Sequence, residues 1–125
     1  MKIKTADLKG AALDWAVAKC EGEDYSPVIT YDGIGNECPA TNYSSNWDLA
    51  GSIIRRERIS IMAPIVRRIG KERHALPIDL WRAMICTDEN EPVTHGKGAT
   101  ELIAAMRCFV ASKLGDEVEV PEELA

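Results

Sequence analysis

The sequence is short of the residues that build metal sites and disulfides. Its four cysteines and two histidines are widely separated, and no two cysteines form a Cys-x-x-Cys pair. Zinc sites depend on such short paired spacings, and a reducing compartment disfavours disulfides. We therefore expect no structural metal, no native disulfide and no cofactor.

Long hydrophobic segments are also missing. No apolar run approaches the roughly 18 residues that indicate a membrane span, and the polar N-terminal residues lack the apolar core of a signal peptide. We expect an intracellular protein with no membrane partner.

A catalytic constellation is the third absence. Cys38 could be paired with His74 or His95 as a base, but nothing in the spacing fixes their geometry. No two acidic residues are spaced in a way that implies acid–base chemistry. The sequence therefore predicts that the protein is not an enzyme.

The residues that are present are typical of one ordinary globular domain. The chain has 125 residues, of which 46% are hydrophobic and 28% charged. Hydrophobic residues at helical spacing predict a helix over Asp7–Glu21, capped by Thr5 or Asp7 and stopped by Gly22. A second helix is predicted between the N-cap Thr100 and the terminator Gly115.

Each predicted helix has one face of small side chains, so we expect the two helices to pack together. Between them, Asp79–Cys86 is predicted to be a strand whose core face carries Trp81, Ala83 and Ile85. Two dense β-branched segments, Ser52–Arg56 and Arg58–Met62, predict an antiparallel hairpin or one long bent strand.

The remaining segments have loop composition. Residues 23–51 are predicted to be a long loop with one short strand at Val28–Tyr31, residues 64–77 to contain at most a helical turn, and residues 87–97 to be a polar turn region. The predicted fold is α+β: an N-terminal helix, a small, mostly antiparallel sheet of three to four strands, and a C-terminal helix packed with the first. Residues 1–115 form the single domain, and residues 116–125 an acidic, solvated tail that could alternatively dock a basic partner.

Charge is distributed unevenly along the chain. From Arg55 to Arg73 there are seven basic and two acidic residues, whereas the whole chain has a net charge of −5. Such a cluster favours either nucleic-acid binding or pairing with the acidic remainder, and pairing or solvation is the commoner case. The candidate nucleic-acid contacts are Arg55, Arg56, Arg58, Arg67 and Arg68.

A small anion site is suggested by His95-Gly-Lys-Gly-Ala-Thr100, which lies directly before the second predicted helix. Backbone N–H groups at such a position can bind an anion, with Lys97, Gly98 and Thr100 as the candidate residues. The segment lacks the full phosphate-loop pattern, so a capped turn is the simpler interpretation.

Tyr43 and Trp47 are the candidate partner surface, although either could instead anchor the long loop to the core. Another alternative is a homodimer that buries an apolar flank of a helix.

Three segments together resemble a known family. They are Thr5–Gly22, Ser45–Ile61 and Leu102–Pro121, and in this order they are similar to the NinX-like proteins of tailed bacteriophages and prophages. The resemblance implies a small protein of the bacterial host cytoplasm, and the family carries no catalytic residues to transfer. We expect a non-enzymatic protein-interaction module that acts during phage development on a host or phage protein. The alternative is a nucleic-acid-associated factor that uses the basic region 55–73.

Overall fold

The structure is a computed structural model that describes residues 1–27, 30–31, 34, 37–38, 40–64, 66–69, 71–75, 80–86 and 93–125. Residues 30–31, 37–38, 66–69 and 72–75 are described by their backbone alone. The described residues fold into three α-helices and short antiparallel strands, which confirms the predicted α+β class.

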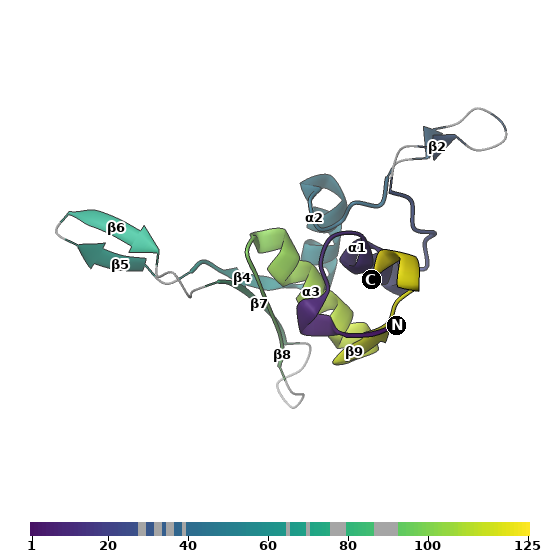
Figure 1. The fold of residues 1–125 in the computed structure, drawn as a ribbon. Helices are drawn as coiled ribbons and strands as arrows, with labels where there is room; N and C mark the ends of the chain where they lie inside the picture. The colour runs from purple at the N-terminus through teal and green to yellow at the C-terminus, as the bar shows by residue number, and fades with distance from the viewer. Residues whose placement is uncertain are drawn as a thin grey trace.

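Helix α3 (Glu101–Leu114) lies at the centre of the body, between α1 (Gly10–Glu21) and a small sheet (Figure 1). Most of the small residues predicted to bring α1 and α3 together are buried in one core, and the two helices are in contact. They are Ala12, Ala16, Ala104, Ala105 and Cys108, whereas Ala11 and Ser112 are exposed. The capping interactions of α3 are also as predicted, because Thr100 Oγ1 accepts from the Ile103 N–H at 3.2 Å. At the other end Gly115, with φ 85°, terminates the helix.

Helix α1 begins later than predicted. Thr5–Asp7 forms a separate 3-10 turn, η1, and the N-cap of α1 is Lys9, which makes no side-chain capping bond. Thr5 instead donates its hydroxyl to the Gly115 carbonyl at 2.6 Å. The N-terminal segment is therefore bonded to the end of α3.

The two ends of the chain pair with each other. Strand β1 (Lys2–Lys4) runs antiparallel to β9 (Glu117–Glu119), and a last 3-10 turn, η2, covers Glu122–Leu124. Val118 and Val120 are 4% and 1% exposed. The prediction of a solvated tail is thus wrong for this part of residues 116–125, because two valines of the tail belong to the core.

The central sheet has the strand order β4 (Ser60–Met62), β7 (Trp81–Ile85) and β8 (Thr94–Gly98), all antiparallel. The predicted strand is confirmed at β7, where Ala83 and Ile85 are buried. Strand β8 was not predicted: the expected turn region of residues 87–97 is wrong from residue 94 onward, and residues 87–92 lie outside the described part.

The predicted strand at Ser52–Arg56 is wrong as well. These residues belong to helix α2 (Trp47–Glu57), whose N-cap is Asn46: its Oδ1 accepts from the Asp48 N–H at 2.9 Å. Ala50 and Ile53 face the core one helical turn apart. Burial of this face outweighed the β-branched character on which the strand prediction was based.

Two hairpins project from the body (Figure 1). The longer one pairs β5 (Val66–Ile69) with β6 (Glu72–Ala75), where a helical turn was predicted. The shorter one pairs β2 (Thr30–Tyr31) with β3 (Glu37–Cys38). The predicted strand Val28–Tyr31 is confirmed at its last two residues, and residues 28–29 are outside the described part.

None of the helices in the described ranges combines the length and the apolar character needed to cross a bilayer.

Candidate binding groove at the edge of the sheet

Two glycines allow strand β8 to lie directly on helix α3. A Cβ atom on Gly96 would come within 2.4 Å of the Ala104 carbonyl oxygen, and one on Gly98 within 2.5 Å of Ile103 Cγ2. Real Cβ atoms do not approach other atoms so closely, so a larger residue would push the strand away. The glycines therefore allow β8, the edge strand of the sheet, to pack closely against α3.

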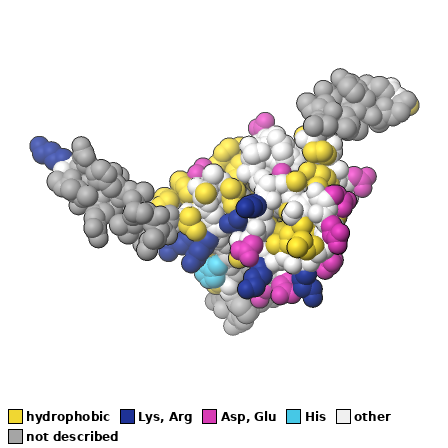
Figure 2. All heavy atoms as spheres, in the orientation of Figure 1, with side chains coloured by type: hydrophobic (Ala, Val, Ile, Leu, Met, Phe, Trp, Pro, Cys, Tyr) yellow, Lys and Arg dark blue, Asp and Glu magenta, His cyan; other side chains and the backbone are white. Residues whose placement is uncertain are grey.

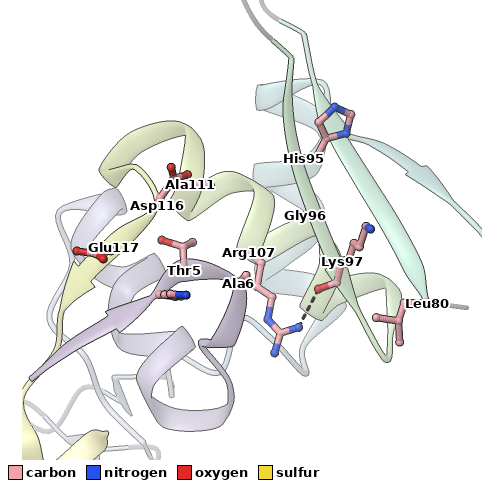
Figure 3. A pocket seen from close by; sticks show the side chains of 11 residues that line it. Thr5, Ala6, Leu80, His95, Gly96, Lys97, Arg107, Ala111, Asp116 and Glu117 are labelled. Atoms are coloured by element: carbon pink, nitrogen blue, oxygen red, sulfur yellow. Dashed lines mark hydrogen bonds between the residues drawn. The ribbon is translucent and has the colours of Figure 1, made fainter. Parts of the chain in front are cut away.

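A hollow of roughly 550 Å³ lies along the outer edge of β8 (Figure 3). Strand β8 forms one wall, η1 and the start of β9 form the other, and α3 contributes Arg107 and Ala111. We call this hollow the edge groove. It is lined by Lys4, Thr5, Ala6, Leu80, His95, Gly96, Lys97, Arg107, Ala111, Asp116 and Glu117.

Arg107 bridges the two walls of the edge groove. Its Nε donates to the Leu8 carbonyl at 2.7 Å, and its Nη1 donates to the Lys97 carbonyl at 2.8 Å. Burial lowers the pKa of the Arg107 guanidinium, while the charge of Asp7 opposes this shift. The guanidinium thus holds the N-terminal segment beside β8 and keeps the groove at its width.

The backbone of β8 leaves hydrogen-bonding groups toward the groove. The Lys97 carbonyl points away from β7, toward Arg107 (Figure 3). In an antiparallel ladder a residue directs its N–H and C=O to the same side, and residues two apart behave alike. The N–H of Lys97 and both backbone groups of His95 therefore face the groove, and no described residue binds them from that side.

The structure separates the three residues of the candidate anion site. Lys97 lines the edge groove, whereas Thr100 lines a second hollow with Trp47, Ser44 and Ser45. The Thr100 hydroxyl oxygen already accepts a hydrogen bond from the Ile103 N–H, as the N-cap of α3. Gly98 is buried against α3, so its glycine character is explained by close packing.

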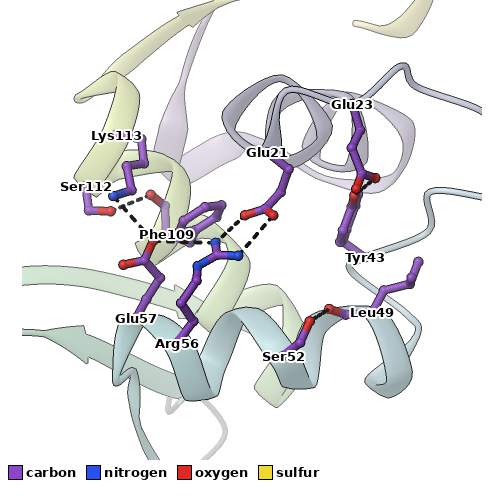
Figure 4. A network of polar contacts seen from close by, with 10 residues as sticks. All are labelled: Glu21, Glu23, Tyr43, Leu49, Ser52, Arg56, Glu57, Phe109, Ser112 and Lys113. Atoms are coloured by element: carbon purple, nitrogen blue, oxygen red, sulfur yellow. Dashed lines mark hydrogen bonds and ion pairs between the residues drawn. The ribbon is translucent and has the colours of Figure 1, made fainter.

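The candidate nucleic-acid contacts are likewise divided between elements. Arg56 on α2 is paired with Glu21 of α1 through both terminal nitrogens, and with Glu57 at 3.5 Å (Figure 4). Lys113 reaches the same Glu57 at 3.3 Å. The guanidinium of Arg56 also lies 5.8 Å from the centroid of the buried Phe109 ring.

Arg55 and Arg58 are exposed at the end of α2. Arg67 and Arg68 lie on β5 in the projecting hairpin, and their side chains are outside the description. On the face shown in Figure 2, acidic and basic side chains lie intermingled over the lower part of the body. The described side chains on this face do not form one continuous basic surface.

The two aromatic candidates have different environments. Tyr43 is 4% exposed, and its hydroxyl donates to Glu23 at 2.6 Å (Figure 4), so it anchors the segment before α2 to the core. Trp47 is 53% exposed at the start of α2. Of this pair, only Trp47 presents a ring to a partner.

The side chains of Cys38 and His74 lie outside the described part, while His95 lines the edge groove. Among the described residues, no three histidine, cysteine or acidic side chains are close enough to hold a metal ion. The sequence interpretation missed Arg107, since it treated the last helix as a packing element. The available signal was a single charged residue between Met106 and Cys108, both of which are buried.

Comparisons with known proteins agree with this fold. Residues 4–113 match the family described as Bacteriophage P22, NinX. A solved structure described as a phage protein from Bacillus cereus has 12% sequence identity and a TM-score of 0.51, and the match covers 94% of this chain and 93% of that one. At this identity the likeness concerns the fold alone. No curated protein matched the chain. Because the family match spans most of its length, the chain belongs to the phage NinX family.

Proposed function

We propose that this protein is a non-enzymatic interaction module that binds a host or phage protein in the bacterial cytoplasm during phage development. The observation that carries the proposal is the open edge of β8 inside the edge groove. An exposed strand edge binds an extended peptide by main-chain hydrogen bonds, and neighbouring pockets take alternate side chains.

The groove has a suitable size and lining for such a segment. Its volume of about 550 Å³ is in the range of pockets that enclose small ligands. Leu80, which is 41% exposed, offers an apolar contact together with Ala6 and Ala111. The outward backbone groups of His95 and Lys97 supply donors and an acceptor in a row.

The test uses two substitutions of one residue. His95→Pro removes the outward N–H of β8, and proline is tolerated at the edge of a sheet because that N–H is not part of the ladder. His95→Ala removes the side chain and keeps the N–H. Tagged wild-type protein and both variants are purified from phage-infected cells, and bound proteins are quantified by mass spectrometry.

A protein retained by wild type and His95→Ala but lost from His95→Pro supports docking at the edge. Equal retention by all three would place the interaction elsewhere on the molecule, and the absence of any stoichiometric protein would argue against the module itself. Circular dichroism of each variant controls for folding.

A second candidate function is nucleic-acid association through the projecting hairpin. The register of β5 and β6 places Arg68 opposite Arg73 and Arg67 opposite His74. Like charges at one rung of a ladder destabilise it unless an anion is present. A salt-sensitive gel shift that Arg68→Gln and Arg73→Gln abolish would support this function. Nucleic acid in the eluates described above, insensitive to His95→Pro, would point the same way.

A further inference from the structure

Arg107 is a half-buried cation that forms no ion pair with a described residue, although the charge of Asp7 acts on it from a greater distance. Both of its recorded hydrogen bonds go to backbone carbonyls, and no carboxylate of the described residues lies within ion-pair distance of it. Burying a guanidinium without a paired anion costs free energy. Its remaining N–H groups are positioned beside the edge groove.

Lys97 adds a second cation on the same wall. Its side chain is exposed, and among the described residues it forms no ion pair. In Figure 3 the Arg107 guanidinium is bonded to the Lys97 carbonyl, whereas the Lys97 ammonium extends away from the guanidinium. Two cations next to the open backbone of β8 make this end of the groove attractive for an anion.

The opposite wall of the groove carries both signs of charge, because Lys4 lies there beside two acidic residues. Asp116 and Glu117 lie on the far wall (Figure 3), and Glu117 is paired with the exposed Lys2 at 3.8 Å. A chain of phosphates running along the groove would meet these carboxylates and be repelled. A single carboxylate beside Arg107 and Lys97 avoids this repulsion.

We infer that the edge groove binds an extended peptide segment through a glutamate or aspartate side chain held by Arg107 and Lys97. This inference rests on the proposed function, because the peptide is the segment that pairs with β8. The planar guanidinium suits a carboxylate because it can offer two parallel N–H donors.

The experiment starts from random peptides, since the natural partner is unidentified. A display library is selected on the wild-type protein, and binders that His95→Pro weakens are retained. Each retained peptide is synthesised with a free and with an amidated C-terminus, together with an amidated counterpart in which its acidic residue is replaced by the corresponding amide residue. Affinities are measured by fluorescence anisotropy on wild type, Lys97→Gln, Arg107→Lys and Lys71→Gln.

We expect the acidic peptide to bind wild type about tenfold more tightly than the amide, because charge-assisted hydrogen bonds are about twice as strong as neutral ones. Lys97→Gln reduces the affinity for the acidic peptide several-fold and leaves that for the amide nearly unchanged. Lys71→Gln removes the same charge at the tip of the β5–β6 hairpin and changes neither affinity. If Arg107→Lys does not fold, Lys97→Gln alone decides the question.

The possible failures are distinct. Retained peptides that bind equally well as acid and amide overturn the acidic specificity and leave edge docking intact. Peptides that bind only with a free C-terminal carboxylate overturn the side-chain assignment. If no selected peptide is sensitive to His95→Pro, edge docking itself fails, and this inference fails with it.

Discussion

Gly96 on β8 lies so close to Ala104 on α3 that a Cβ atom on the glycine would be 2.4 Å from the Ala104 carbonyl oxygen. The backbone nitrogen of Cys108 would be only 2.6 Å from the same Cβ. The neighbours are backbone atoms of a central helix, so they cannot move aside as a flexible side chain would. This contact sets the distance between the sheet and the helix, and with it the shape of the edge groove.

The substitution Gly96→Ala should therefore destabilise the protein by about 1–3 kcal/mol, the usual cost of overpacking a core. Urea denaturation followed by circular dichroism measures the change in the free energy of unfolding. Gly51→Ala is the matched control, because Gly51 lies within α2 and an added Cβ meets nothing within 4 Å. This control should be more stable than wild type by about 0.5–1 kcal/mol through helix propensity. A neutral Gly96→Ala would mean that β8 can move away from α3 freely.

The glycines of β8 also explain why the sequence was misleading at this point. A short segment rich in glycine before a helix is compatible with an anion-binding turn, and the sequence alone does not show what the glycines pack against. The same composition serves close contact between a strand and a helix. The anion-site hypothesis grouped Lys97 and Thr100, which line different hollows.

The sequence predicts an element well when its start, its apolar pattern and its end are all marked by local residues. The α3 helix has an N-cap threonine, a regular apolar stripe and a terminal glycine, and its ends match the prediction. The β7 strand alternates in burial as its sequence alternates. In α2 the local signals conflicted: Ile53 and Ile54 favour a strand, whereas Asn46 favours a helix start, and tertiary burial of Ile53 decides between them.

Contacts between residues that are far apart in the chain cannot be predicted from local sequence patterns. Residues 116–125 have the composition of a solvated tail, yet Val118 pairs with Ile3 from the opposite end of the chain. Arg107 was missed for the same reason, because its partners Leu8 and Lys97 come from separate segments. The edge groove exists only where these segments meet.

The role of the C-terminal residues can be tested at Val120, which is 1% exposed. Val120→Ala removes buried methyl groups and should lower the free energy of unfolding by about 1–2 kcal/mol. Glu122→Ala alters an exposed residue two positions later and should change it by less than about 0.5 kcal/mol. Thermal and urea denaturation of both variants provide the comparison. If Val120→Ala and Glu122→Ala were equally stable, the residues around Val120 would behave as a solvated tail.

Cys108 predicts a loss of stability at alkaline pH. It is fully buried and its thiol donates to the Thr94 carbonyl at 3.2 Å; burial raises its pKa from 9.0 to about 11. Since the folded state favours the neutral thiol, its contribution is complete below pH 9 and is lost as the pH rises through 11. The expected loss is about 3 kcal/mol, from 1.36 kcal/mol for each of about two pKa units.

The free energy of unfolding of wild type and Cys108→Ala should be measured by urea denaturation from pH 7 to 11. The variant is less stable at pH 7 because of the cavity it creates, but its stability should fall less steeply above pH 9. Cys20, whose pKa burial also raises to about 11, and Tyr43, whose pKa burial raises as well, contribute to the slope that remains. Parallel curves for the two proteins would contradict the assignment of this proton to Cys108.

Arg58 offers a prediction in the stabilising direction. It ends α2 with φ 54° and ψ 50°, the left-handed conformation that glycine adopts without steric cost. Arg58→Gly should therefore raise the free energy of unfolding by about 0.5–1 kcal/mol, because the strain of a side chain at positive φ is removed. Arg55→Gly is the control within the same helix and should lower it by about 1 kcal/mol. Opposite signs for two arginines only three positions apart, in one urea-denaturation series, would show that α2 ends at Arg58. A destabilised Arg58→Gly would instead indicate that the Arg58 side chain makes a contribution larger than its backbone strain.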